Sequence, residues 1–237
     1  MSSTDLRGQA TQFVESVLEL NLAVAVFDCD GTLWSGDAGR DFFYWEIERC
    51  FVSPDVGQWA RARHREYLAG RVSEERMCSE MVTMNRGLSY ETLQNAAAEF
   101  YDEVVMKREF PEMHGLIRRL GLQGCDVWAV SSTNHWVVEV GAKRFGIAPD
   151  HVLAACVHVD DGRVTDRLIR VPTDDLKALA IRQVVGKPVD AVFGNSVHDH
   201  AMLEMAKYPI CVNPTSELER IARERGWPVY WPERPMR

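Results

Sequence analysis

Asp28 and Asp30 are the two side chains of this sequence best placed to do chemistry. They directly follow an apolar run, residues 22–27, and precede Gly31-Thr32. Such a run is typical of a short strand covered on both faces of a parallel sheet, and ligands of open α/β sheets bind just beyond the carboxyl ends of strands. In an extended segment the two carboxylates would point the same way and repel, unless a cation or a shared proton compensates. A polar turn is the alternative interpretation, because Asp, Gly and Thr are common in turns.

A second polar site is predicted at Ser131. It follows an expected strand, residues 125–130, and precedes an expected helix, residues 134–145. Free backbone N–H groups at a helix start attract anions, and the serine hydroxyl could donate to a phosphoryl oxygen. The alternative is that the polar residues after Ser131 only cap the helix.

Asn195 and Asp199 follow a third expected strand, residues 189–193. Their side chains are therefore expected at the same edge of the sheet as Asp28. His198 and His200 lie nearby, but two histidines at positions i and i+2 of a helix point apart. We interpret them as solvent-facing or pocket-lining residues rather than as a metal-binding pair.

Lys177 lies in an expected helix, residues 173–185. The predicted core face of this helix carries Leu176, Leu179 and Ala180, and Lys177 lies off that face. Taken alone it would be a surface lysine, because lysine is almost never buried without a partner.

The elements that would position these residues alternate between strands and helices, apart from one helical block. Further expected strands are 152–159 and 163–166, which flank the hairpin signal Asp160-Asp161-Gly162, and 210–212. Helices are expected at 10–18, 38–51, 55–69, 73–85, 89–107, 113–120, 199–206 and 216–225. The alternation predicts a doubly wound, mostly parallel α/β sheet, the block from 37 to 108 predicts an inserted all-helical cap, and the tail from Trp227 to Arg237 is expected to be irregular.

Composition limits the classes of partner. The chain has 237 residues, of which 46% are hydrophobic and 26% charged, and its net charge is −8. This acidic balance argues against nucleic acid or an anionic membrane as a main partner. Six scattered cysteines form no zinc or disulfide pattern, and neither a signal peptide nor a membrane span is predicted. We therefore expect a cytoplasmic protein whose partner is a small molecule.

The chemistry-bearing segments, taken in order, resemble the four motifs of the haloacid dehalogenase (HAD) superfamily of phosphohydrolases. The resemblance covers nearly the whole chain and is carried by the following residues: Asp28-x-Asp30-Gly31-Thr32, Ser131, Lys177 and Gly194-Asn195-Ser196-x-x-Asp199. It is strongest to the branch that contains the phosphoserine phosphatases. One departure is Asn195, where the family usually has an acid.

The resemblance implies a core domain formed by residues 1–36 and 109–237 and a cap domain formed by residues 37–108. It also implies a Mg²⁺-dependent phosphomonoester hydrolase that works through an aspartyl-phosphate. In that mechanism Asp28 is the nucleophile and Asp30 the general acid and base.

The other motifs receive binding roles by the same resemblance. Ser131, Ser132 and Lys177 would bind phosphoryl oxygens. Asp28, the Asp30 carbonyl and Asn195 would hold Mg²⁺, and Asp199 would orient Lys177 or the waters of the metal. The alternatives are a dehalogenase, against which Asp30 counts because a halide needs no proton, and a HAD-fold binding or regulatory protein, which only Asn195 suggests.

The substrate is expected to contact Asp37 and Trp34. Asp37 lies nine residues after Asp28, where the resembled phosphoserine enzymes carry an acid that faces the substrate amine. The aromatic ring of Trp34 could add a cation–π contact. Packing in the core of the cap is the alternative for the neighbouring aromatic residues. We expect a small phosphomonoester that carries an amine.

Overall fold

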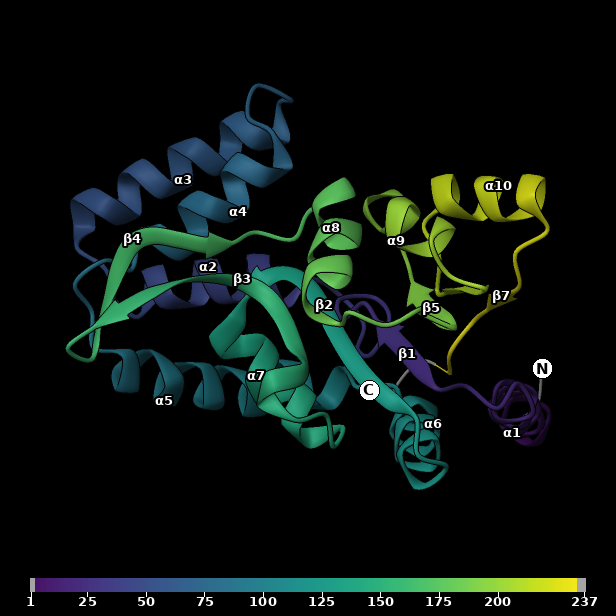
Figure 1. The fold of residues 1–237 in the computed structure, drawn as a ribbon. Coiled ribbons are helices and arrows are strands. Elements are labelled where there is room, and N and C mark those ends of the chain that lie inside the picture. Colours follow the sequence, from purple (N-terminus) through teal and green to yellow (C-terminus); the bar gives the residue numbers. More distant parts are fainter. Residues whose placement is uncertain (1–2, 234–237) are drawn as a thin grey trace.

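The computed structural model describes residues 3–233, which form a seven-stranded sheet of order β4-β3-β2-β1-β5-β6-β7 with helices on both faces (Figure 1). Every neighbouring pair is parallel except β3 and β4. The strands are β1 Val24–Phe27, β2 Asp126–Asn134, β3 Val152–Asp160, β4 Arg163–Arg170, β5 Ala191–Gly194, β6 Tyr208–Val212 and β7 Val229–Tyr230. The α-helices are α1 Ser3–Leu18, α2 Ala38–Glu48, α3 Pro54–Leu68, α4 Glu74–Thr83, α5 Tyr90–Phe100, α6 Pro111–Leu122, α7 His135–Arg144, α8 Asp175–Val184, α9 His200–Glu204 and α10 Ser216–Arg225.

Strand β1 lies at the centre of the sheet, and this position explains why its sequence is apolar throughout. Ala25 and Phe27 belong to a core cluster shared with α1, α6 and α7. Val24 and Val26 belong to a second cluster shared with α8, α9 and α10. Alternate residues of a strand face opposite sides, so each side of β1 has its own layer of helices. The predicted doubly wound, mostly parallel sheet is confirmed.

Residues 38–108 contain helices and no sheet strand, and they have a core of their own around Phe43, Ala60 and Met77. One expected helix differs from the structure. Instead of a single helix at 89–107, α5 ends at Phe100 and continues as a π-helix, Tyr101–Val105, and a 3₁₀ turn, Met106–Arg108. The Tyr101 ring is buried in this widened turn.

The β3–β4 hairpin has the turn that its sequence predicts and extends the sheet toward the helical segment (Figure 1). The Gly87 N–H donates to the Val164 carbonyl at 2.7 Å, and the Val164 N–H donates to the Leu88 carbonyl at 3.0 Å. Tyr90 N–H donates to the Gly162 carbonyl at 2.9 Å. Backbone hydrogen bonds therefore tie the hairpin to the chain between α4 and α5.

The C-terminal tail was expected to be irregular, which is wrong for Val229–Tyr230. These residues pair with β6 as a parallel edge strand. The Tyr230 ring stacks on Phe13 with ring centroids 3.7 Å apart, and its hydroxyl donates to Glu112 at 2.8 Å. Aromatic anchoring thus overrides the proline-rich signal. The part of the tail beyond residue 233 lies outside the described residues. No helix within residues 3–233 has both the length and the apolar character needed to cross a bilayer.

Candidate active site

The motifs converge on one cavity of about 220 Å³ at the carboxyl edge of β1, β2 and β5. Nine of the residues singled out from the sequence line it: Asp28, Asp30, Asp37, Ser131, Ser132, Lys177, Asn195, Ser196 and His198. Residues of the helical segment form the opposite wall, among them Arg40, His64, Tyr67, Glu74, Met77 and Cys78. The cavity therefore lies between the sheet edge and the helical segment.

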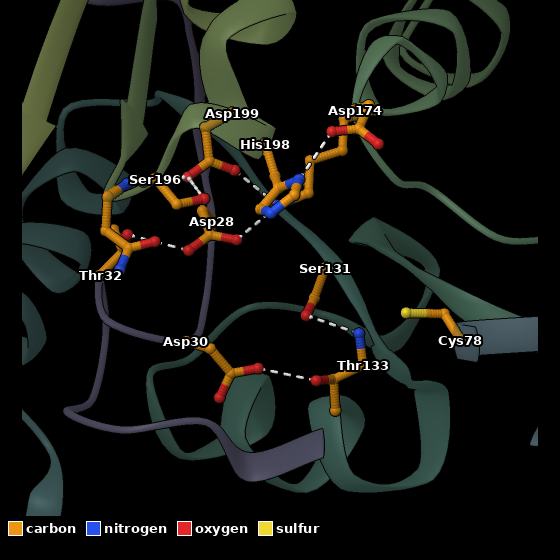
Figure 2. Close-up of polar contacts among 12 residues, drawn as sticks. Asp28, Asp30, Thr32, Cys78, Ser131, Thr133, Asp174, Ser196, His198 and Asp199 are labelled. Carbon is orange, nitrogen blue, oxygen red and sulfur yellow. Dashed lines mark hydrogen bonds and ion pairs between the residues drawn. The ribbon is translucent and has the colours of Figure 1, made fainter. Parts of the chain in front are cut away.

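Asp28 is fixed where β1 leaves the sheet. Its N–H donates to the Phe193 carbonyl at 2.8 Å, and its side chain is 4% exposed. Lys177 Nζ donates to Asp28 Oδ1 at 2.7 Å, and Thr32 Oγ1 donates to Asp28 Oδ2 at 3.0 Å. The carboxylate thus points into the cavity in one orientation (Figure 2).

Lys177 is buried between two carboxylates. Its Nζ also donates to Asp199 Oδ1 at 2.6 Å. Asp199, which lies behind the cavity wall, accepts N–H bonds from Asn195 and Ser196 on its other oxygen, at 2.8 and 2.9 Å. One lysine therefore holds the first and fourth motifs together.

The expected core face of α8 is confirmed for Ala180 and wrong for Leu179 and Lys177. Leu179 was assigned to the core face but is 44% exposed, whereas the side chain of Lys177 is 3% exposed. The inward face consists of Lys177, Ala178, Ala180 and Ile181. The two carboxylates make burial of the lysine possible, because they compensate the charge that burial would otherwise leave unpaired.

Ser131 lies within β2 rather than after it, because the strand continues to Asn134 with a shift in register between Ser131 and Asn134. Such an irregularity turns side chains out of the ladder, and Ser132 and Thr133 both line the cavity. Asn134 caps α7 by accepting the Val137 N–H at 3.0 Å. Ser131 Oγ accepts the Thr133 N–H at 3.1 Å, which leaves its hydroxyl hydrogen free to donate.

Asp30 differs from Asp28 in its donors. Its Oδ1 accepts from the Ala38 N–H at 2.6 Å and from Trp34 Nε1 at 2.7 Å, and its Oδ2 accepts from Thr133 Oγ1 at 2.7 Å. Trp34 is fully buried and does not line the cavity. The structure therefore places Trp34 behind Asp30 rather than against a substrate.

The three aspartates that line the cavity hold protons more tightly than usual. Burial raises the pKa of Asp28 to about 7, and Asp199 adds to this rise while Lys177 opposes it. Burial also raises the pKa of Asp30, against the N–H and O–H donors just described. Burial among neighbouring groups raises the pKa of Asp37 to about 6, and the charge of Asp30 adds to this rise. One side of Asp37 nevertheless reaches solvent. Groups with such shifts are common where acid–base chemistry occurs.

Asn195 places an amide in the cavity. Gly31 has a φ of +82°, and a Cβ built on it would lie 1.9 Å from Asn195 Nδ2, so a glycine is required here. Asp28, the Asp30 carbonyl and the Asn195 amide are all oxygen donors, which suit Mg²⁺ in type. Among residues 3–233 there is no group of three or more His, Cys, Asp or Glu side chains placed to hold a metal. The donor set therefore depends on an amide and a backbone carbonyl.

The histidines of the fourth motif do not form a metal pair. His198 lines the cavity, and its Nδ1 is 2.7 Å from Asp174 Oδ1. His200 Nε2 lies 3.6 Å from Glu204.

Sequence reasoning missed three cavity residues that matter to the geometry: Thr133, Tyr67 and Glu74. Thr133 was considered only as a helix cap. The Tyr67 hydroxyl donates to Glu74, and both side chains come from the helical segment. No spacing in the sequence relates Tyr67 and Glu74 to Asp28, because only the fold brings them to the same cavity.

Comparisons with known proteins identify the family of the chain. The sequence model of the haloacid dehalogenase-like hydrolases matches residues 25–204. The chain is 24% identical over 217 residues to a histidinol-phosphatase of Neisseria meningitidis, covering 87% of this chain and 97% of that protein. It is 25% identical over 217 residues to the phosphoserine phosphatase SerB1 of Mycobacterium tuberculosis, covering 87% and 70%. A crystal structure of a protein of unknown function from Bordetella pertussis superposes with a TM-score of 0.73 at 26% identity, covering 87% of this chain and 97% of that chain.

The raised pKa of Asp28 predicts a stability difference that depends on pH. Between pH 4 and pH 7 the folded protein holds a proton that the unfolded chain has released, so wild-type stability falls as pH rises through this window. Asp28→Asn lacks this proton. In metal-free buffer we compare the free energy of unfolding of Asp28→Asn with that of wild type. We expect the value for the variant minus the value for wild type to be about 1–3 kcal/mol larger at pH 8 than at pH 4.

Urea unfolding at the two pH values measures this difference. Asp161→Asn, in the exposed hairpin turn, is the control and should show no such change. An Asp28→Asn difference that is constant or shrinks as pH rises would contradict the prediction.

Proposed function

Because the chain belongs to the haloacid dehalogenase-like hydrolases, we propose that its cavity hydrolyses a small phosphomonoester through a phosphoryl group carried by Asp28. At the coarser level the protein is a phosphatase of this family. The observation that carries the finer proposal is the position of Asp28. Its carboxylate is buried, oriented by Lys177 and Thr32, and faces the cavity.

The phosphoryl group would be bound by donors that surround Asp28. Lys177 Nζ supplies a buried positive charge, and the free hydroxyl hydrogen of Ser131 supplies a donor. Ser132 also faces the cavity. An anionic phosphoryl group beside Asp28 is stabilised by these groups, since charge-assisted hydrogen bonds are strong where water is excluded.

Asp28 attacks phosphorus as the bond to the leaving oxygen breaks, and Asp30 gives that oxygen a proton. Asp30 then takes a proton from the water that attacks the aspartyl-phosphate. The raised pKa of Asp30 suits this exchange, because a group that shuttles a proton works best with a pKa nearer the working pH.

Mg²⁺ fits the proposal through the oxygen donors of Asp28, the Asp30 carbonyl and Asn195. When bound, it neutralises negative charge on the phosphoryl group and on the two aspartates. The helical segment 37–108 would act as the cap over the cavity, since Tyr67 and Glu74 belong to its wall.

The alternatives are less compatible with the site. A dehalogenase has no need for an acid at Asp30, and here that acid is held by three donors. A purely binding protein has no need for a buried nucleophile whose charge must be balanced by an equally buried lysine.

Phosphate release from p-nitrophenyl phosphate in the presence of Mg²⁺ is the direct test. Asp28→Asn is expected to lose activity by at least about 10³-fold, because an amide cannot act as nucleophile. Its circular dichroism and thermal unfolding should remain those of a folded protein. Acid-quenched wild-type enzyme should carry phosphate on Asp28. Wild-type rates in Asp28→Asn would exclude the mechanism.

Asn195→Asp tests the proposed metal shell. An added negative ligand should tighten Mg²⁺ binding, because ligand charge sets the affinity for hard cations. We expect a Kd for Mg²⁺ about 10-fold lower by calorimetry, with a matching fall in the Mg²⁺ concentration needed for half-maximal activity. Asn95→Asp, an exposed position on α5 away from the cavity, adds the same negative charge and serves as the control for the change in net charge. Unchanged Mg²⁺ affinity in Asn195→Asp would mean that residue 195 is not a ligand.

The far wall of the cavity favours a substrate that carries an amine. Asp37 and Glu74 place two carboxylates there. Arg40 also lines the cavity, but both Nε and Nη2 donate to Asp41. The cap arginines Arg63 and Arg76 pair with Glu80 and do not line the cavity. Arg40 is thus the one arginine among the described lining residues, and its ion pair with Asp41 competes with any substrate carboxylate. Two of the relatives are named for phosphoserine and for histidinol, and both of these compounds carry an amine. We propose that the substrate of this protein carries an amine as well.

Phosphoethanolamine and propyl phosphate form a matched pair, because they differ at the terminal group. We expect kcat/KM to be about 10- to 100-fold higher for phosphoethanolamine, as an ionic hydrogen bond predicts. Asp37→Asn should remove most of this preference and leave propyl phosphate little changed. A substrate panel in which kcat/KM for phosphorylated sugars far exceeds that for phosphoserine, phosphoethanolamine and phosphocholine would contradict the proposal that the substrate carries an amine.

A further inference from the structure

The carboxylate of Asp30 is held on both oxygens before any substrate is present. Oδ1 accepts two N–H groups, from Ala38 at 2.6 Å and from Trp34 Nε1 at 2.7 Å. Oδ2 accepts one hydroxyl, from Thr133 at 2.7 Å, and Figure 2 shows these two side chains facing each other. The two oxygens therefore have chemically different partners.

The difference decides which oxygen can carry a proton. A backbone or indole N–H can only donate, so a proton on Oδ1 would face two donors without an acceptor. The Thr133 hydroxyl can rotate and accept, so a proton on Oδ2 keeps a partner. Thr133 lines the cavity, whereas Ala38 and Trp34 do not. The oxygen able to carry the proton is therefore the one on the cavity side.

Trp34 is itself held rigidly. Its side chain has no exposed surface and packs edge-on against Tyr101, with ring centroids 5.6 Å apart. A Cβ built on Gly141 of α7 would come within 2.7 Å of the indole ring. The glycine at position 141 thus leaves the space in which the indole reaches Asp30.

We propose that Trp34 is a positioning residue for catalysis, which anchors Oδ1 of Asp30 so that Oδ2 delivers and later receives the catalytic proton. This inference rests on the proposed phosphatase mechanism and adds a residue to it. As the bond from phosphorus to the leaving oxygen breaks, its electron pair stays on that oxygen, which takes the proton from Asp30 Oδ2 while Asp28 bonds to phosphorus. In the second half Oδ2 takes a proton from water, and the water oxygen displaces Asp28.

Thr133 is expected to be the second member of this arrangement. A Cβ built on Gly39 would lie 2.4 Å from Thr133 Oγ1, so the chain also keeps space open beside this hydroxyl. Both side-chain donors to Asp30 are thus accommodated by a glycine on a neighbouring helix, Gly141 on α7 and Gly39 on α2.

Trp34→Phe removes the donor and keeps an aromatic ring, and Trp136→Phe is its matched control. Trp136 is 1% exposed, lies in the same core cluster, and its Nε1 has no hydrogen-bond partner. Each variant is assayed with phosphoethanolamine, whose alkoxide needs a proton to leave, and with p-nitrophenyl phosphate, whose leaving group needs none.

The expected readout is a loss of kcat/KM that depends on the leaving group. Trp34→Phe should lose about 10- to 100-fold in kcat/KM on phosphoethanolamine, as changes behind a reacting group typically do. It should lose less than about threefold in kcat/KM on p-nitrophenyl phosphate, because kcat/KM covers only the steps up to loss of the leaving group and not the later attack of water. Trp136→Phe should change both substrates by the same factor, because a general loss of stability does not distinguish leaving groups.

An equal loss on both substrates in Trp34→Phe, or no loss on either, would overturn the proposal. If that variant does not fold, Thr133→Val and Thr133→Ser decide. The proposal requires the leaving-group-dependent loss in the valine variant and its recovery in the serine variant, and the absence of that pattern overturns it. Wild-type enzyme that releases no phosphate from either substrate would instead refute the proposed function.

Discussion

A buried lysine between two buried carboxylates is the interaction on which the site depends. Lys177 Nζ lies 2.7 Å from Asp28 and 2.6 Å from Asp199, and none of the three side chains has more than a small contact with water. Removing Lys177 leaves two buried carboxylates without a positive partner, which costs several kcal/mol, whereas removing one carboxylate leaves the lysine paired with the other. The same cluster carries one more negative than positive charge. This excess, together with burial, raises the pKa of Asp28, so the site is built at the expense of stability near neutral pH.

The turn after β5 depends on that cluster. Asp199 fixes the turn after β5 through the N–H groups of Asn195 and Ser196, so the amide that would serve the metal is positioned by the residue that also holds the lysine. The substitution of Asn195 for the usual acid lowers the negative charge beside Asp28 by one unit. In a cavity that is already lined by three aspartates, this change favours the approach of an anionic phosphoryl group.

The sequence predicts the parts of this site that follow from local pattern. The strand before Asp28, the hairpin at Asp161 and the strand–helix alternation all have short-range signals, and the structure confirms them. Helical periodicity alone could not predict the inward direction of Lys177, because it assigns a lysine to the surface unless its distant partners are known, and only the resemblance to the family motifs placed this lysine in the site. The position of Trp34 behind Asp30 likewise depends on Gly141, more than 100 residues away in the sequence. The edge strand at Val229 was missed because the stacking of Tyr230 on Phe13 is a long-range contact.

The backbone bonds between the β3–β4 hairpin and residues 87–90 have a mechanical consequence. An inserted segment joined to its host only by its two covalent crossings, here near residues 36 and 109, is free to rock about the line that connects them. A third attachment away from that line removes this freedom, and the hairpin supplies one through the ladder around Val164. The part of the helical segment around residues 87–90 is therefore held in place by the hairpin. Rocking of the helical segment about its two crossings is therefore opposed at the hairpin, as well as where α4 and α5 pack into the core beneath the sheet.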